Sequence, residues 1–382
     1  MSNNIKTMKL IVSIFSVCAL NILINAQVNA ADGHVDSYEQ IWGNATIYNN
    51  SDNNILQKLV CTGRLQADYA NFDDQDAGSL NDTPFRRARI GFKATLYNDF
   101  TVHSEMDMDF NDTDPVYNRL TDSYIAWQPE DNWKIKIGKQ SAGFTLDGAT
   151  SSKKLIAIER SKVAGNIWFS KEYFNGISYS AQRDAWNYTV GIFSNDGGAE
   201  LDDAFEESHF VLLSAGYDFA DSFGGDKTVI RLDYVHQEEP NDFDNFNTKK
   251  HENVISLNGK WQKDSLHFWG DIAYAEGFTG YELFAVQLMP FYDLSEKYQL
   301  VSRYTYIHSS EDNQIGLSRY EKNLVSGKGD EVQELFLGVN AYYYGHKLKW
   351  QNGIQFTKMN DAANDGGEYD GIGFTSAIRI SW

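Results

Sequence analysis

The chain has 382 residues, a net charge of −20 and a high aromatic content of 14%, with only 5 prolines. No run of about 18 apolar residues follows its first thirty positions, which excludes membrane-spanning helices. Such an acidic chain is also a poor partner for nucleic acid. The aromatic content suits the two girdles of a membrane-spanning β-barrel. A secreted β-sandwich or β-rich hydrolase is compatible with the same composition.

Residues 1–30 have the pattern of an export signal peptide. Lys6 and Lys9 precede an apolar stretch at 10–24, and Val28-Asn29-Ala30 provides a cleavage site. A lipoprotein signal at Cys18 fits less well, because apolar residues continue beyond that cysteine. Cleavage would leave a single cysteine, which excludes an internal disulfide.

The chain beyond the signal divides into two predicted parts. Residues 31–58 include an Asn-rich stretch and are expected to form a periplasmic N-terminal extension rather than a folded domain. Residues 59–382 are expected to form an all-β, transmembrane antiparallel β-barrel. The function of the extension does not follow from its composition.

Sixteen segments of the second part alternate apolar and polar residues, as strands with one buried face do. They lie near 60–71, 85–97, 100–110, 119–128, 132–140, 176–183, 186–194, 208–219, 226–236, 253–263, 265–275, 282–292, 297–308, 332–344, 346–358 and 370–382. Their connections alternate between short turns and mostly long loops. This alternation is typical of outer-membrane barrels and places both termini in the periplasm. Boundaries read from a sequence carry errors of about two to four residues, so fourteen or eighteen strands also fit.

The two faces of each segment differ in character. In the second segment Ile90 and Phe92 share one face, and Arg87, Arg89 and Lys93 share the other. A sixteen-stranded barrel is too wide to fill with its own side chains. The apolar face is therefore expected to meet lipid, and the charged face to line a water-filled channel.

The connection at 141–175 is the longest and the third of the long loops. Its basic residues outnumber its acidic ones: Lys153, Lys154, Arg160, Lys162 and Lys171 against Asp147, Glu159 and Glu172. A loop of this length can fold into the lumen and form a constriction; a surface loop is the alternative. The adjacent Glu159 and Arg160 either pair with the barrel wall or contact the solute.

Basic residues on the polar faces are the expected anion contacts. Together with the third loop they are Arg64, Arg87, Arg89, Lys93, Lys134, Lys136, Lys153, Lys154, Arg160, Arg303, Lys347, Lys349 and Arg379. Glu105, Asp107 and Asp109 are the expected counter-charges in the lumen. Four of the lysines follow short turns and would form a basic ring at the periplasmic mouth. This arrangement predicts a modest preference for anions, unless a β-bulge reverses the faces of a strand.

The final segment alternates Phe374, Ser376, Ile378, Ile380 and Trp382 with mostly polar residues. At the edge of an open sheet such a strand would be exposed to aggregation. A closed barrel has no edge, because its last strand pairs with its first.

Several strings resemble the phosphate-selective porins O and P. They are GRLQADY at 63–69, FRRARIGF at 85–92, EMDMDF at 105–110, LTDSYI at 120–125, IKIGKQ at 135–140, VSRYTY at 301–306 and LGVN at 337–340. The resemblance implies a homotrimeric, sixteen-stranded outer-membrane channel that prefers small anions, in some members phosphate or polyphosphate. It also implies contact with outer-membrane lipid and lipopolysaccharide, and no cofactor.

Two other functions remain open alternatives. One is a non-specific general diffusion porin. The other is a barrel-embedded or secreted β-rich enzyme, which the sequence favours less, because its eight histidines lack metal-ligand spacing and it contains no GxSxG, HExxH or phosphate-loop motif.

Overall fold

The computed structural model describes residues 37–112, 114–169, 172–196, 200–202, 204–206, 208–240 and 247–382. The expected signal peptide and Lys171 lie outside these residues. None of the helices in the described residues is long and apolar enough to cross a membrane.

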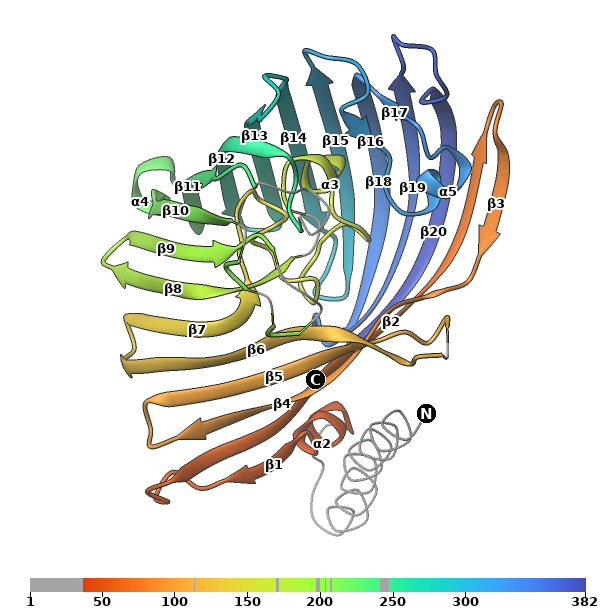
Figure 1. The fold of residues 1–382 in the computed structure, drawn as a ribbon. Coiled ribbons are helices and arrows are strands. Elements are labelled where there is room, and N and C mark those ends of the chain that lie inside the picture. Colours follow the sequence, from red (N-terminus) through yellow and green to blue (C-terminus); the bar gives the residue numbers. More distant parts are fainter. Residues whose placement is uncertain are drawn as a thin grey trace.

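Sixteen long antiparallel strands form one barrel, as the sequence predicts (Figure 1). They are β2 (Leu56–Asp74), β4 (Phe85–Leu96), β5 (Phe100–Met108), β6 (Tyr117–Glu130), β7 (Trp133–Ser141), β8 (Tyr173–Arg183), β9 (Trp186–Ser194), β10 (His209–Asp218), β11 (Lys227–Gln237), β12 (His251–Lys263), β13 (Leu266–Gly277), β14 (Glu282–Asp293), β15 (Tyr298–Ser309), β18 (Glu331–Tyr344), β19 (Leu348–Asn360) and β20 (Tyr369–Ser381). The barrel closes where β2 pairs with β20, from Arg64 opposite Ser381 to Asp74 opposite Gly371.

Short helices and strands lie at the two ends of the barrel. Helix α2 (Ser37–Gly43) and strand β1 (Thr46–Asn49) precede the barrel, and β1 pairs with the start of β2. The connection expected to be a long loop at 72–84 is instead a hairpin, in which β3 (Gly78–Asp82) pairs with the extended end of β2. Helix α4 (Ala220–Phe223) occupies one short turn.

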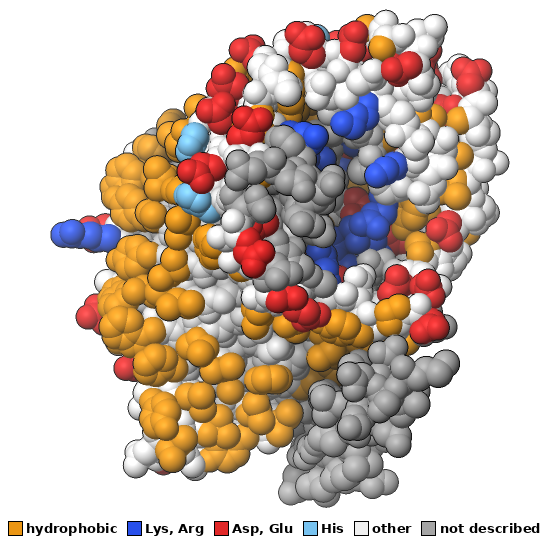
Figure 2. Space-filling model, in the orientation of Figure 1, with side chains coloured by type: hydrophobic (Ala, Val, Ile, Leu, Met, Phe, Trp, Pro, Cys, Tyr) orange, Lys and Arg blue, Asp and Glu red, His pale blue; other side chains and the backbone are white. Residues whose placement is uncertain are grey.

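Apolar side chains cover the outside of the barrel. On β12, Ile255 and Leu257 are 44% and 49% exposed, whereas the intervening Ser256 is fully buried on the inner side. The same period of two recurs around the sheet, and Figure 2 shows the resulting apolar surface over the strands. Because lipid cannot satisfy polar groups, such a surface identifies the outer face of the barrel as lipid-facing.

Loop 3 (residues 142–172, numbering the long loops in chain order) folds into the lumen, as predicted, and carries helix α3 (Lys162–Asn166). Figure 1 shows α3 inside the ring of strands. Phe144 and Phe169 of this loop are fully buried with Phe174, Phe193 and Phe210 of the wall. The sequence predicted a polar inner face, but the inner face is not polar throughout. Part of it is apolar because loop 3 packs there.

Loop 7 (residues 310–330) also enters the lumen. It contains β16 (Ile315–Gly316), helix α5 (Tyr320–Leu324) and β17 (Lys328–Gly329). Its Ile315 and Leu317 belong to the same apolar cluster as α3 of loop 3. Two inward loops thus enter the lumen and pack against each other.

Candidate functional site

A β-bulge on β4 sets the basic character of the wall facing loop 3. Gln66 of β2 lies opposite Arg87, whereas the next residue, Ala67, lies opposite Phe85, which leaves Arg86 as the extra residue. Such a bulge interrupts the inside–outside alternation of a strand. Both Arg86 and Arg87 consequently point inward. The alternation of the sequence predicts the inward position of Arg87 but not that of Arg86.

Two other arginines of this wall, Arg64 on β2 and Arg89 on β4, form ion pairs with acidic residues on β5. Arg64 Nη2 lies 2.7 Å from Glu105 Oε1, and Arg64 Nη1 donates to Ser152 Oγ at 2.5 Å. Arg89 Nε lies 3.3 Å from Asp107 Oδ1. Glu105 and Asp107 therefore occupy the expected counter-charge positions. Asp109 does not, because it lies beyond the end of β5 and accepts hydrogen bonds from the backbone N–H groups of the outer loop.

Loop 3 contributes its own charges to this wall. Glu159 is paired with Arg86, and Arg86 Nη2 lies 2.9 Å from Glu159 Oε2. Arg160 Nη1 lies 2.7 Å from Glu172 Oε1, and the guanidinium covers the Trp168 ring at 4.7 Å. Although burial acts to raise it, the neighbouring Arg160 lowers the pKa of Glu172 to about 2. The adjacent Glu159 and Arg160 thus serve two different pairs, one to the wall and one within the loop.

Three basic residues of the expected set are bound to other groups of the protein. Lys349 Nζ donates to the Leu155 carbonyl of loop 3 at 2.5 Å. Arg303 Nη2 lies 2.7 Å from Glu334 Oε1, and Arg379 pairs with Asp68. Lys349 and Arg303 are buried where loop 3 contacts the wall, and Arg379 is buried against β2.

The remaining lysines of the expected set differ in their accessibility. Lys347 is exposed in a turn beside the ring of Tyr344, at 4.8 Å, and not on the inner wall. Lys93 and Lys154 are exposed, and Lys134 is partly exposed. Lys136 Nζ lies 4.9 Å from the Tyr124 ring centre.

Lys153 lies near Arg64 of the wall. Its Nζ donates to the backbone oxygen of Trp382 at 3.2 Å. Burial, together with the positive charge of Arg64, lowers the pKa of Lys153 to about 8. This lysine therefore titrates within reach of physiological pH.

A polar cavity of about 400 Å³ lies between loop 3 and the wall. Its charged lining consists of four basic residues, Arg64, Lys136, Arg160 and Arg231, and two acidic residues, Asp122 and Glu172. Ser and Thr hydroxyl groups from loop 3, β8 and β9 complete the surface. In Figure 2, Lys and Arg side chains gather in the hollow of the visible face, and Asp and Glu side chains surround it. Among the described residues, no cluster of His, Cys, Asp or Glu is arranged to hold a metal ion.

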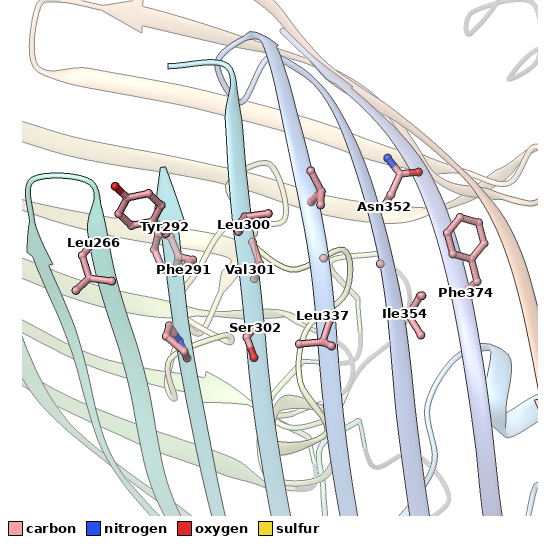
Figure 3. A pocket seen from close by; sticks show the side chains of 14 residues that line it. Leu266, Phe291, Tyr292, Leu300, Val301, Ser302, Leu337, Asn352, Ile354 and Phe374 are labelled. Atoms are coloured by element: carbon pink, nitrogen blue, oxygen red, sulfur yellow. The ribbon is translucent and has the colours of Figure 1, made fainter. Parts of the chain in front are cut away.

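A wider hollow of about 590 Å³ lies outside the lumen, across β14 to β20 (Figure 3). Exposed apolar side chains such as Leu300, Leu337 and Ile354 line it. The β14–β15 ladder skips Pro290, which has no N–H to donate. This hollow belongs to the lipid-facing surface and offers no charged group to a polar solute.

Comparisons with known proteins agree with this arrangement. Residues 60–262 match the family described as phosphate-selective porin O and P. Porin O of Pseudomonas aeruginosa is 31% identical over 157 residues, which cover 39% of this chain and 35% of that protein. An uncharacterized protein of Aquifex aeolicus is 23% identical over 344 residues, covering 74% of this chain and 78% of the relative.

Solved structures share the fold at low identity. An anion-selective porin from Comamonas acidovorans has a TM-score of 0.61 and 13% identity, covering 85% of this chain and 99% of that chain. OmpF of Salmonella typhi, in complex with daunomycin, has a TM-score of 0.58 and 14% identity, covering 88% and 100%. With the sixteen-stranded barrel, its apolar outer face and the inward third loop, the family match leads to one conclusion. The chain belongs to the phosphate-selective porin O and P family and is a porin of the outer membrane, a channel and not an enzyme.

Proposed function

We propose that this porin passes small anions in preference to cations, with phosphate or polyphosphate as the favoured solute. The observation that carries the proposal is the charge of the passage. Its cavity is lined by four basic and two acidic residues, although the whole chain has a net charge of −20.

The lumen charge matters more than the total charge because low-dielectric walls focus the field inside a narrow passage. Many of the acidic residues lie in the outer loops, where water and salt screen them. A guanidinium has five N–H donors, so an arginine that is already paired can still bind an oxyanion. Arg64 is such an arginine, since it lines the cavity although it is paired with Glu105.

The relatives support the same solute class. The matching family is described as phosphate-selective, and one structure of similar fold is an anion-selective porin. We also propose a homotrimer, because porins of this fold include OmpT of Vibrio cholerae, solved in a trimer form. Crosslinking of protein extracted in mild detergent should give trimers; a uniform monomer would contradict this part of the proposal.

Phosphate preference is tested by blocking chloride current. Wild-type channels in planar bilayers should carry chloride, and added phosphate should reduce that current at concentrations where sulfate has a weaker effect. Lys153→Met should weaken the block, because it removes a charge beside Arg64. Lys358→Met, which removes an exposed charge from the outer face of β19, should not. A wild-type chloride current that phosphate leaves unchanged would reduce the function to general diffusion.

The N-terminal segments extend the proposal. We propose that residues 1–30 are removed on export and that 31–58 lie in the periplasm, where α2 contacts the barrel end. Trp42 Nε1 donates to the Ser381 carbonyl at 2.6 Å, and Tyr38 stacks on Tyr344 with ring centres 5.6 Å apart. Intact-mass analysis of the exported protein would show whether it begins at Ala31.

A further inference from the structure

Loop 7 is fixed inside the lumen by the residues that follow Arg319. The Tyr320 hydroxyl donates to Asp68 Oδ2 at 2.8 Å, and its ring lies 5.3 Å from that of Phe72. Glu321 forms an ion pair with Lys162 of loop 3 and accepts a hydrogen bond from Gln355 at 2.5 Å. Both the wall and loop 3 thus hold this part of loop 7.

Arg319 itself has a strained backbone. Its φ of 59° and ψ of −120° correspond to the first central position of a type II′ turn, which glycine favours. A side chain at that position costs free energy, and such residues persist where the surroundings determine the conformation. The strain therefore suggests a role for the side chain that glycine could not perform.

Among the described residues the Arg319 side chain forms no hydrogen bond or ion pair, although Glu159 and Asp68 lie close enough to act on its charge electrostatically. Arg319 lines a small hollow between loop 3, loop 7 and the wall, and the acidic groups of that hollow already have partners. Both oxygens of Glu159 accept from Arg86, Glu321 pairs with Lys162, and Glu334 pairs with Arg303. Because Arg319 is an exposed residue and makes no direct contact with these carboxylates, it is available to a solute.

We propose that Arg319 is an oxyanion-binding residue on the outer side of the loop 3 constriction, where it captures phosphate-like solutes before they reach the deeper cavity. The proposal rests on the anion preference proposed above. Loop 7 joins the ends of β15 and β18 opposite the short turns, so its inward tip faces solutes that enter from outside. A planar guanidinium binds two oxygens of an oxyanion at once, which a spherical chloride cannot reproduce.

The test compares four channels in planar bilayers: wild type, Arg319→Gly, Arg319→Lys and Lys322→Ala. Glycine removes the guanidinium and suits the backbone at this position, so the variant is expected to fold at least as well as the wild type. Lys322→Ala is the matched control, since it removes an exposed charge from the same loop. Phosphate is added to the outer side while chloride current is recorded, and heat-shifted mobility in gels confirms that each barrel is folded.

We expect the half-inhibitory phosphate concentration to rise about 5-fold in Arg319→Gly, the size of one solvated charge contact. It should stay unchanged in Lys322→Ala, and Arg319→Lys should recover only part of the effect because an ammonium cannot bind bidentately. If phosphate blocks the wild type and Arg319→Gly equally, the role of Arg319 is wrong while the anion channel stands. If phosphate blocks neither, the proposed function fails and this inference fails with it.

Discussion

Both oxygens of the Glu159 carboxylate in loop 3 accept hydrogen bonds from Arg86 on β4. This pair joins the constriction loop to the barrel wall through a residue that only a bulge turns inward. The loop is thereby held against the arginines that line the passage.

Replacement of Arg86 by methionine should loosen loop 3. The change leaves Glu159 without its partner inside the lumen, which costs on the order of 3 kcal/mol for a largely buried pair. We expect a noisier single-channel current and a lower unfolding temperature. The double variant Arg86→Met with Glu159→Leu should recover most of the stability, since it removes both charges. Equal loss in the single and double variants would show that the pair itself is unimportant.

Anion preference should depend on pH through Lys153. Its pKa is lowered to about 8, so it is charged below that pH and loses its charge as the pH rises through it, whereas an ordinary lysine keeps its charge to about 10.4. The anion-to-cation permeability ratio should therefore fall between pH 7 and pH 9. Lys153→Met should show the low ratio throughout this range and no such fall. A ratio that falls equally in both proteins would assign the titration to another group.

A substitution in the apolar contacts that hold loop 3 should affect the channel differently from a substitution in its ion pairs. Phe144 is fully buried, with its ring centre 5.0 Å from that of Phe169. Phe144→Ala should cost about 3–5 kcal/mol, largely from docking of the loop. We expect a larger single-channel conductance with the barrel still folded. Phe374→Ala, on the lipid-facing side, should leave the conductance at the wild-type value.

The depth at which lipid-facing residues lie in the membrane can be tested with arginine substitutions on the outside of the barrel. Leu257→Arg places a charge near the middle of β12, where it should cost about 2–4 kcal/mol. Leu266→Arg, next to a short turn at the end of the barrel, should cost at most about 1 kcal/mol. Both residues are similarly exposed in the structure, at 49% and 47%. Equal effects on folding into lipid vesicles would contradict the assigned depth.

The sequence predicted the strands well because lipid on one side and water on the other impose a strict period of two. It also predicted the inward loop 3 from its length and position. The predicted assignment of residues to the inner and outer faces of the strands was wrong or incomplete where this period breaks. Arg86 is the extra residue of a bulge, which no residue pattern in β4 signals, and Asp109 lies past the end of its strand.

The roles of the basic residues were harder to predict than their faces. Lys349 and Arg303 point inward, yet their partners come from residues distant in the chain, such as Leu155 and Glu334. Loop 7 gave no recognisable signal, because its inward position depends on tertiary contacts such as Tyr320 with Asp68. Arg319, which lies beside that contact, could therefore not be singled out from the sequence.

The central claim, that the lumen prefers anions despite the negative chain, is tested most directly by the reversal potential of wild-type channels in a potassium chloride gradient. The four basic and two acidic residues of the cavity predict a potential of the sign that chloride permeation gives. A potential of the opposite sign, showing that potassium is the more permeant ion, would contradict the account.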